Sequence, residues 1–136
     1  MKILLDTNVV LDVLLERQPY NQVSSKIFSL SSKKNLELFI TSTIVTDLYY
    51  IISKLLSRKT AKEFLINLIE IVDICGVDKS AVFQAIKSDF NDLEDAVQYF
   101  AATIEGIDVI ITRNKKDFIL SDIDILTPDE FIKEIV

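Results

Sequence analysis

The chain has 136 residues, 49% of them hydrophobic, and its 21 acidic and 15 basic side chains give a net charge of −6 at pH 7. A chain of this length folds as one domain and buries roughly two thirds of the surface that its unfolded form exposes, so it needs no disulfide or structural metal for stability. The absence of histidine excludes Ser-His-Asp and Cys-His catalysis, and the single cysteine excludes an internal disulfide and a multi-thiolate zinc site.

No apolar stretch reaches the roughly 18 residues that a membrane-spanning helix needs, and the N-terminus lacks the pattern of a secretory signal. We therefore expect one domain over residues 1–136, located in the cytoplasm and not associated with a membrane. Cys75 lies within an apolar stretch, which predicts a buried and unreactive thiol. The net negative charge by itself disfavours broad binding to nucleic acid, but divalent cations bound by converging acids would reverse the local potential.

The first twelve residues combine a strand and the start of a helix. Residues 3–5 are continuously apolar, as in a strand that is buried on both faces of a parallel sheet. Asp6, Thr7 and Asn8 are residue types that end a strand and cap a helix, and the apolar residues after them have helical spacing. Asp6 is thus predicted at the carboxyl end of a central strand, where open α/β sheets bind ligands. A helix cap without further function fits this segment equally well, so the rest of the chain has to decide.

Helices and strands alternate along the rest of the chain. Further strands are predicted at residues 36–40, 71–77, 108–112 and 123–126. Helices are predicted up to residue 17, then around 23–30, 42–56, 61–69, 80–86 and 92–102, and from 127 onward. This alternation predicts an α/β fold, a three-layer α/β/α sandwich with a mainly parallel central sheet of about five strands.

Four acids from separate segments are predicted to gather near one edge of this sheet. They are Asp6, Asp47, Asp95 and Asp117. The turns that follow parallel strands lie along the same edge, and ligands bind there. For Asp47 a solvated or capping role fits equally well, and the helix dipole alone explains Asp92, Glu94 and Asp95 at the start of a helix.

An acidic cluster without histidine or thiolate offers only oxygen ligands, which suit Mg²⁺ or Mn²⁺ better than zinc. Such ions generate a hydroxide nucleophile and stabilise an in-line displacement at phosphorus, so hydrolysis of a phosphodiester is the natural reaction. Arg113, Lys115 and Lys116 lie beside Asp117 and are candidates to hold substrate phosphates, although exposed basic side chains more often face only solvent. The chain has no glycine-rich phosphate loop, which disfavours a nucleotide-binding site.

Four segments of the chain together resemble the motifs of PIN domains. They are Leu5–Val9 (LDTNV), Thr46–Tyr50 (TDLYY), Leu93–Ala96 (LEDA) and Ile111–Phe118 (ITRNKKDF). The segments follow in the right order over the whole chain, so the likeness does not depend on any one of them. It implies a PIN-like α/β/α sandwich and an endoribonuclease that depends on Mg²⁺ or Mn²⁺.

By match of motif, the resemblance implies that Asp6 and Asp95 are the principal metal ligands, Asp47 the second acid and Asp117 the fourth. Residues that would support them are Thr7, Asn8, Glu94, Thr112 and Asn114. The chain departs from the family at Asp47, because the second acid is usually a glutamate and Asp47 is one methylene shorter. This difference implies contact with the metal through water, or a weaker or absent second ion, and Glu94 is an alternative ligand.

Many small single-domain PIN proteins are similar to VapC toxins, which form homodimers and are blocked by an antitoxin peptide inserted into the acidic groove. The resemblance therefore implies an RNA substrate, an antitoxin partner and a homodimer. Tyr49 and Tyr50 are candidate anchors of a dimer interface, and packing in the core explains them equally well.

Two other classes of function compete with the nuclease. One is a PIN-like binding or scaffold protein without catalysis, for which the acids need not approach within the reach of one metal ion. The other is a flavodoxin-like phospho-acceptor domain that uses Asp6. It is disfavoured because no later strand offers a phosphorylatable aspartate paired with a lysine at a strand end.

Overall fold

The computed structural model describes residues 1–120 and 122–136. Within these residues, one sheet of five parallel strands has the order β3-β2-β1-β4-β5. Its strands are β1 (Lys2–Leu5), β2 (Glu37–Thr41), β3 (Asp73–Cys75), β4 (Val109–Ile111) and β5 (Asp124–Leu126). The apolar strand β1 lies in the centre of the sheet, and its residues 3–5 are fully buried, as predicted.

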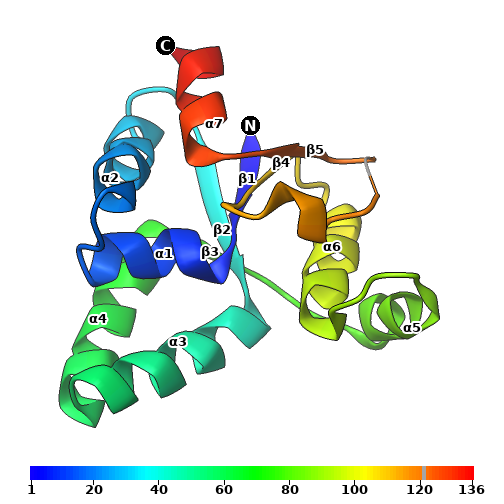
Figure 1. Ribbon diagram of the computed structural model, residues 1–136, viewed down its shortest axis with the longest axis horizontal. Helices are drawn as coiled ribbons and strands as arrows, with labels where there is room; N and C mark the ends of the chain where they lie inside the picture. Colours follow the sequence, from blue (N-terminus) through cyan, green and yellow to red (C-terminus); the bar gives the residue numbers. More distant parts are fainter. Residues whose placement is uncertain (121) are drawn as a thin grey trace.

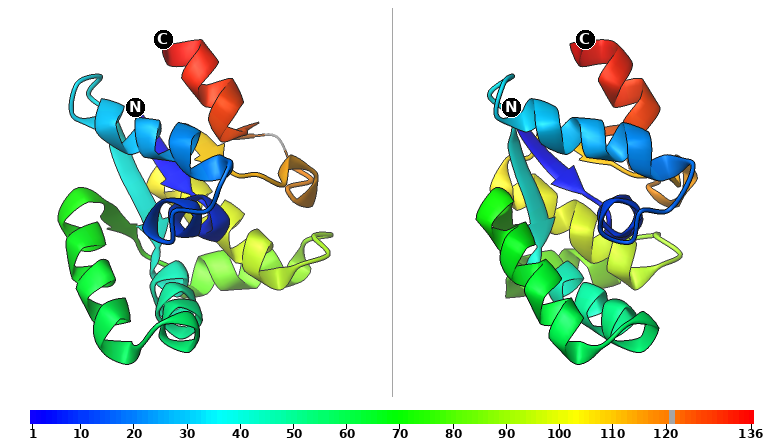
Figure 2. Two further views of the ribbon diagram at one scale, coloured as in Figure 1. Left: turned by 60° about the vertical axis from the view of Figure 1, so that its left-hand side comes forward. Right: turned by 90° about the vertical axis from the view of Figure 1, so that its left-hand side faces the viewer.

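Seven α-helices of the described residues cover the two faces of the sheet (Figures 1 and 2). They are α1 (Thr7–Leu14), α2 (Tyr20–Ser31), α3 (Ser42–Leu55), α4 (Arg58–Ile71), α5 (Lys79–Lys87), α6 (Leu93–Glu105) and α7 (Pro128–Ile135). Successive strand residues point to opposite faces. Ile3 and Leu5 therefore pack with α1 to α4 and α7, whereas Leu4 packs with α5 and α6. These layers confirm the predicted α/β/α sandwich.

Three strands lead directly into helices at the carboxyl edge of the sheet, and a polar residue caps each helix. Asp6 follows β1, Thr41 is the last residue of β2 and Thr127 follows β5. Their side chains accept hydrogen bonds from backbone N–H groups in the first turn of α1, α3 and α7. Capping thus holds polar side chains along the edge where parallel sheets bind ligands.

Some boundaries differ from the predicted ones. The helix α4 begins at Arg58, because Ser57 caps it by accepting a hydrogen bond from the N–H of Thr60 at 3.0 Å. It also continues through Ile71, so the predicted strand 71–77 is reduced to Asp73–Cys75. This strand lies at the end of the sheet and has a single partner strand, which limits its length. No helix of the described ranges is long and apolar enough to span a membrane.

Cys75 is fully buried, as predicted. Its Sγ lies 3.4 Å from the carbonyl oxygen of Ala101 on α6. Burial, with a smaller contribution from the charge of Glu105, raises the pKa of the thiol to about 11. The thiol therefore stays protonated at neutral pH, which suits an unreactive cysteine.

Candidate active site

Asp6 lies at the end of β1, and three donors fix its side chain. Oδ1 accepts hydrogen bonds from the backbone N–H of Thr7 at 2.8 Å and from Gln98 Nε2 at 3.2 Å. Oδ2 accepts a hydrogen bond from Thr112 Oγ1 at 2.8 Å. The residue is only 8% exposed. Donors to both oxygens hold the carboxylate in one orientation, which is the preorganisation that a binding or catalytic group needs.

Thr112 connects Asp6 to the loop that follows β4. Its Oγ1 donates to Asp6 and accepts a hydrogen bond from the backbone N–H of Asn114 at 3.1 Å. Thr112 thus contacts Asp6 directly, and Asn114 is linked to it through the backbone. On the other side of Asp6, Thr7 contributes its N–H, and Asn8 is half-buried in the first turn of α1.

Gln98 is a partner of Asp6 that sequence reasoning missed. It lies three residues after Asp95 on α6, so the two side chains project from neighbouring positions on one helix face. Gln98 is 1% exposed, and its Oε1 has no hydrogen-bond partner within the described residues. The signal that could have found it is an amide in the mostly apolar stretch 96–102, because a buried amide needs hydrogen-bond partners.

Asp95 lies in the first turn of α6. Asp92 caps this helix, because its Oδ1 accepts hydrogen bonds from the N–H of Glu94 at 2.7 Å and of Asp95 at 3.1 Å. The pKa of Asp95 is raised to about 7, first by burial and then by the charges of Asp6, Asp92 and Asp117. A like charge shifts a pKa strongly only from a short distance. The charges of Asp6 and Asp117 therefore act on Asp95 from nearby.

A small cavity of about 120 Å³ opens beside Asp95. It is lined by Asn91, Asp92, Asp95, Lys116, Asp117 and Ile119. Lys116 is thus placed beside the carboxylates, where a substrate phosphate would need a counter-charge.

The other two basic residues predicted to hold phosphates have partners of their own. Lys115 Nζ lies 3.0 Å from Glu130 Oε1 on α7. Arg113 Nε lies 3.0 Å from Asp12 Oδ2, and its guanidinium carbon lies 4.0 Å from the ring centroid of Tyr20. Sequence reasoning placed Asp12 only as a part of the first helix, whereas the structure buries it completely.

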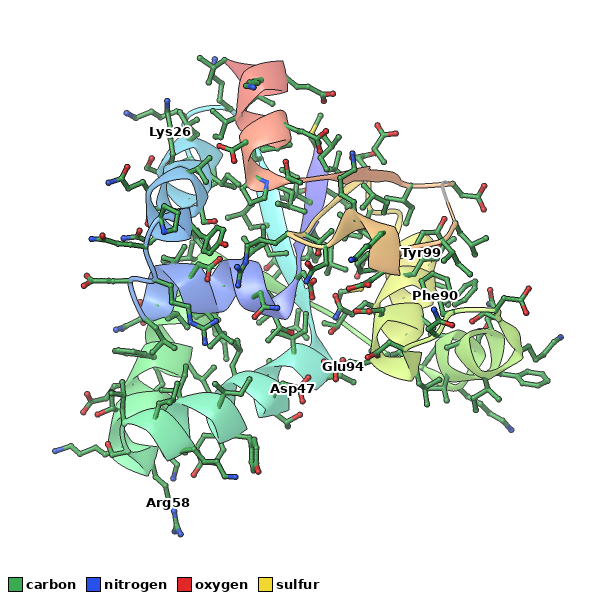
Figure 3. The ribbon with its side chains drawn as sticks, in the orientation of Figure 1. Lys26, Asp47, Arg58, Phe90, Glu94 and Tyr99 are labelled. Carbon is green, nitrogen blue, oxygen red and sulfur yellow. The ribbon has the colours of Figure 1, made fainter. Side chains whose placement is uncertain are left out.

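Asp47 belongs to a second acidic group. It lies on α3 and faces Glu94 at the start of α6 (Figure 3). The pKa of Glu94 is raised to about 8, first by its hydrogen bond with Asp47, then by burial and by the charges of Asp47, Asp92 and Asp95. Glu94 therefore holds its proton more tightly than a free carboxyl group does.

We divide the acids at the edge into two groups, Asp6 with Asp95 and Asp117, and Asp47 with Glu94. Their arrangement bears on metal binding. Among the residues that the structure describes, no three acidic or cysteine side chains are grouped closely enough to hold one metal ion between them. The donors are nevertheless all oxygen atoms, which fit a hard ion such as Mg²⁺ or Mn²⁺. The raised pKa of Asp95 also reflects repulsion between acids, which a bound cation would relieve.

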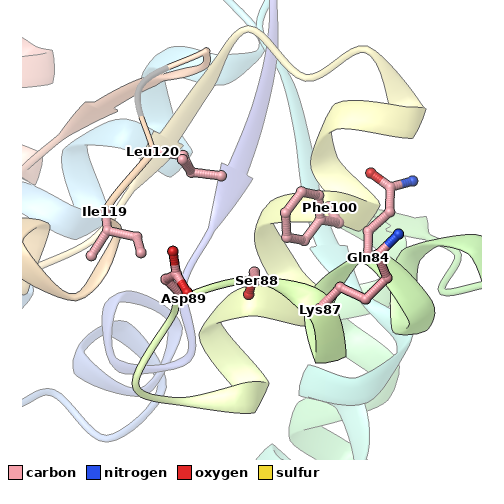
Figure 4. A pocket seen from close by; sticks show the side chains of 7 residues that line it. All are labelled: Gln84, Lys87, Ser88, Asp89, Phe100, Ile119 and Leu120. Atoms are coloured by element: carbon pink, nitrogen blue, oxygen red, sulfur yellow. The ribbon is translucent and has the colours of Figure 1, made fainter.

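A wider hollow of about 320 Å³ lies next to α5 and α6 (Figure 4). Its lining consists of Gln84, Lys87, Ser88, Asp89, Phe100, Ile119 and Leu120. Ile119 is the residue that this hollow has in common with the cavity at Asp95, so the two openings adjoin at one side chain.

The sandwich with acids at its carboxyl edge defines the class of this protein. The family model for PIN domains matches residues 2–116, and the chain belongs to the PIN domain family. The Ribonuclease VapC1 of Aquifex aeolicus is 30% identical to this chain over 134 residues, which cover 96% of this chain and 92% of that protein.

Solved structures show the same fold at lower sequence identity. DNA-bound VapBC from Salmonella typhimurium contains a chain with a TM-score of 0.74 and 20% identity, and the match covers 94% of this chain and 98% of that one. VapBC2 from Rickettsia felis, bound to a DNA fragment of its promoter, gives a TM-score of 0.72 at 16% identity, with 92% and 97% covered.

Proposed function

We propose that this PIN domain protein is an endoribonuclease that hydrolyses RNA with bound Mg²⁺ or Mn²⁺. The observation that carries the proposal is the pair of Asp6 and Asp95 at the carboxyl edge. Three donors hold Asp6, and burial together with the charge of Asp6 and its acidic neighbours raises the pKa of Asp95. The similarity to a relative named as a ribonuclease supports the same activity.

Each residue of the site has a distinct proposed role. Asp6 and Asp95 are the metal ligands, and Asp117 lines the cavity beside Asp95 and completes their group. When bound, the ion supplies a water of lowered pKa and offsets negative charge at the scissile phosphate. Thr112 and Gln98 keep Asp6 in its orientation. Asp47 contributes from the second group, either through water or together with Glu94, and Lys116 binds a substrate phosphate.

We also propose that the protein is the toxin of a toxin–antitoxin pair, acts in the cytoplasm and binds an antitoxin protein. The structures similar to it in fold are complexes named VapBC, which supports a protein partner. A homodimer is part of this proposal. Tyr49 packs against the core, whereas Tyr50 is 59% exposed on α3, so Tyr50 is the candidate anchor of the dimer interface.

A PIN-like binding protein without catalysis is the second candidate. The observation that favours it is that, among the described residues, no three acidic side chains are grouped closely enough to hold one metal ion. A binding protein would leave RNA intact under every metal condition.

Cleavage of single-stranded RNA decides between the two candidates. The proposal expects cleavage with Mg²⁺ or Mn²⁺ and none in EDTA. Water attacks phosphorus and the 3′ oxygen leaves, so the products carry a 5′-phosphate and a 3′-hydroxyl and no cyclic phosphate forms. Asp6→Asn removes the charge and keeps the shape, so it should abolish cleavage. Asp73→Asn changes an exposed acid on β3 and is the matched control. Cleavage that persists in EDTA or at full rate in D6N would overturn the metal mechanism.

A further inference from the structure

A second cavity lies at the same edge of the sheet as the carboxylates. It measures about 180 Å³ and is lined by Tyr20, Val23, Arg113, Thr127, Pro128 and Asp129. Thr127 directly follows β5, just as Asp6 follows β1 and Thr112 follows β4. Because the strands are parallel, these three positions lie along one edge, where open α/β sheets bind their ligands.

A buried acid holds Arg113 at this cavity. Arg113 Nε lies 3.0 Å from Oδ2 of Asp12, which is fully buried on α1. Arg17 supplies a second cation 3.9 Å from the other oxygen of Asp12. A buried carboxylate is costly to leave without a cation, so Asp12 fixes the guanidinium in place.

The fixed guanidinium covers one face of an exposed aromatic ring. Its carbon lies 4.0 Å from the centroid of Tyr20, and Tyr20 is 43% exposed at the start of α2. Arg113 covers one face of the Tyr20 ring, and a cavity lies beside the ring. Tyr20 and Arg113 therefore form a platform on which a second flat group can stack.

Two other exposed rings also lie beside a cation, but they are built differently. They are Tyr50 with Lys54 at 4.6 Å and Phe83 with Lys87 at 4.9 Å. In both pairs the residues are four apart on one helix, where such contacts form from helical geometry alone. Arg113 and Tyr20 come from distant segments, and the buried carboxylate of Asp12 fixes the cation. Their contact therefore depends on the tertiary fold and not on the geometry of one helix.

The chemistry of this platform suits a nucleobase. Unpaired bases of RNA are bound by stacking on aromatic rings and on the plane of an arginine. Asp129 at the cavity repels a phosphate, but it can accept a hydrogen bond from the amino group of a base. A base therefore fits this cavity better than the sugar–phosphate backbone does.

The platform adjoins the carboxylates through one short segment. Arg113 lines the cavity at Tyr20, while Lys116 and Asp117 line the cavity at Asp95. An RNA strand that lies along this edge would meet both cavities in turn. We propose that Tyr20 and Arg113 form a stacking site for an unpaired base of the substrate near the scissile phosphate, an inference that rests on the proposed ribonuclease function.

Binding and kinetics of ring variants test this site. Asp6→Asn serves as the background for binding measurements with a labelled single-stranded oligoribonucleotide, because it leaves the RNA uncut. Tyr20→Leu should weaken binding, and in the active protein raise KM, roughly tenfold while kcat is kept, since stacking of one base on a ring is lost. Tyr20→Phe keeps the ring and should match its parent. Phe83→Leu removes another exposed ring beside a cation and is the matched control, expected to change neither value.

Two further measurements separate stacking from a change in folding. The chain has no tryptophan, so Tyr20→Trp introduces a single indole whose emission the oligoribonucleotide should quench, whereas Phe83→Trp should respond little. An abasic nucleotide, scanned along the oligoribonucleotide, should weaken binding at one position. At that position the abasic nucleotide should not weaken binding to Tyr20→Leu, because this variant has no ring on which the base could stack.

The outcomes distinguish this inference from the proposed function. RNA that is bound with the same dependence on Tyr20 but never cleaved would overturn the ribonuclease and keep the base site. RNA that is cleaved with unchanged KM in Tyr20→Leu, together with equal quenching in Tyr20→Trp and Phe83→Trp, would overturn the base site and keep the ribonuclease.

Discussion

The two acidic groups of the site contrast in how their carboxyl groups are satisfied. Asp6 receives hydrogen bonds from neutral donors, namely a backbone N–H, an amide and a hydroxyl. Glu94 faces Asp47 instead, and its hydrogen bond with Asp47, its burial and the neighbouring negative charges raise its pKa to about 8. A carboxylate fixed by neutral donors keeps its place, and so can receive a cation. A carboxyl group with so high a pKa has to lose its proton first. The neighbours of an acid, more than its residue type, decide what it can bind.

The largest expected effect is the difference in RNA cleavage between variants of the two acidic groups. Asp6→Asn should lower RNA cleavage by more than the roughly 100-fold that changes around metal ligands can reach, because it removes a ligand itself. Asp47→Asn should cost less, since Asp47 lies on α3 facing Glu94 and is not one of the two principal ligands. Initial rates on one RNA substrate measure both. Equal losses would show that the two groups work as a unit.

The donors that hold Asp6 are the next test. Thr112→Val and Gln98→Met remove a donor each and keep the approximate volume, so each should lower cleavage by about 10- to 100-fold, the usual cost of losing support behind a metal ligand. Thr103→Val is a matched control on α6, because its hydroxyl donates to the backbone carbonyl of Tyr99. Full activity in both donor variants would mean that Asp6 needs no help with its orientation.

The raised pKa values of two acids set the direction in which stability in EDTA should change with pH. The pKa values of Asp95 and Glu94 are raised to about 7 and about 8, whereas free carboxyl groups titrate near 4. Ionisation therefore costs the native state more than the unfolded one, and stability is lost as the pH rises through 7 and 8.

The melting temperature without metal should accordingly rise by a few degrees when the pH falls from about 8 to about 5. The double variant Asp95→Asn, Glu94→Gln has no carboxyl groups at these positions and should flatten the profile. A melting temperature that falls over this range in the parent protein would contradict the raised pKa values.

The smallest expected effect concerns the length of the second acid. Asp47→Glu restores the side chain that the family usually has, so it should preserve the rate of cleavage or raise it by no more than a few-fold. The extra methylene lengthens the reach of the carboxyl group. Steady-state rates across a Mn²⁺ series measure the change. A strong loss would mean that the contact with Glu94 requires the shorter side chain.

Much of the fold follows from local patterns that the structure keeps. The apolar run at residues 3–5 is the buried central strand, and Asp6 and Thr127 cap the helices that follow their strands. The bounds of the third strand are the hardest to predict from sequence. No glycine or proline separates it from α4, and as an edge strand it pairs with one neighbour only. Boundaries of this kind depend on which strands pair, and pairing is not local.

The sequence predicts candidate acids for the site but not the contacts around them. Spacing carries no information on Gln98 as a donor to Asp6 or on Asp12 as the partner of Arg113. These contacts join residues about 90 to 100 positions apart and depend on how helices pack on the sheet. Whether Asp47 joins Asp6 or Glu94 depends on the same packing.

Titration with Mn²⁺ followed by calorimetry tests most directly whether the Asp6 group binds the catalytic ion. The parent protein should bind Mn²⁺, the double variant Asp6→Asn, Asp95→Asn should show no binding heat, and the double variant Asp47→Asn, Glu94→Gln should still bind. Unchanged binding in the first double variant would contradict the assignment of the ion to Asp6 and Asp95.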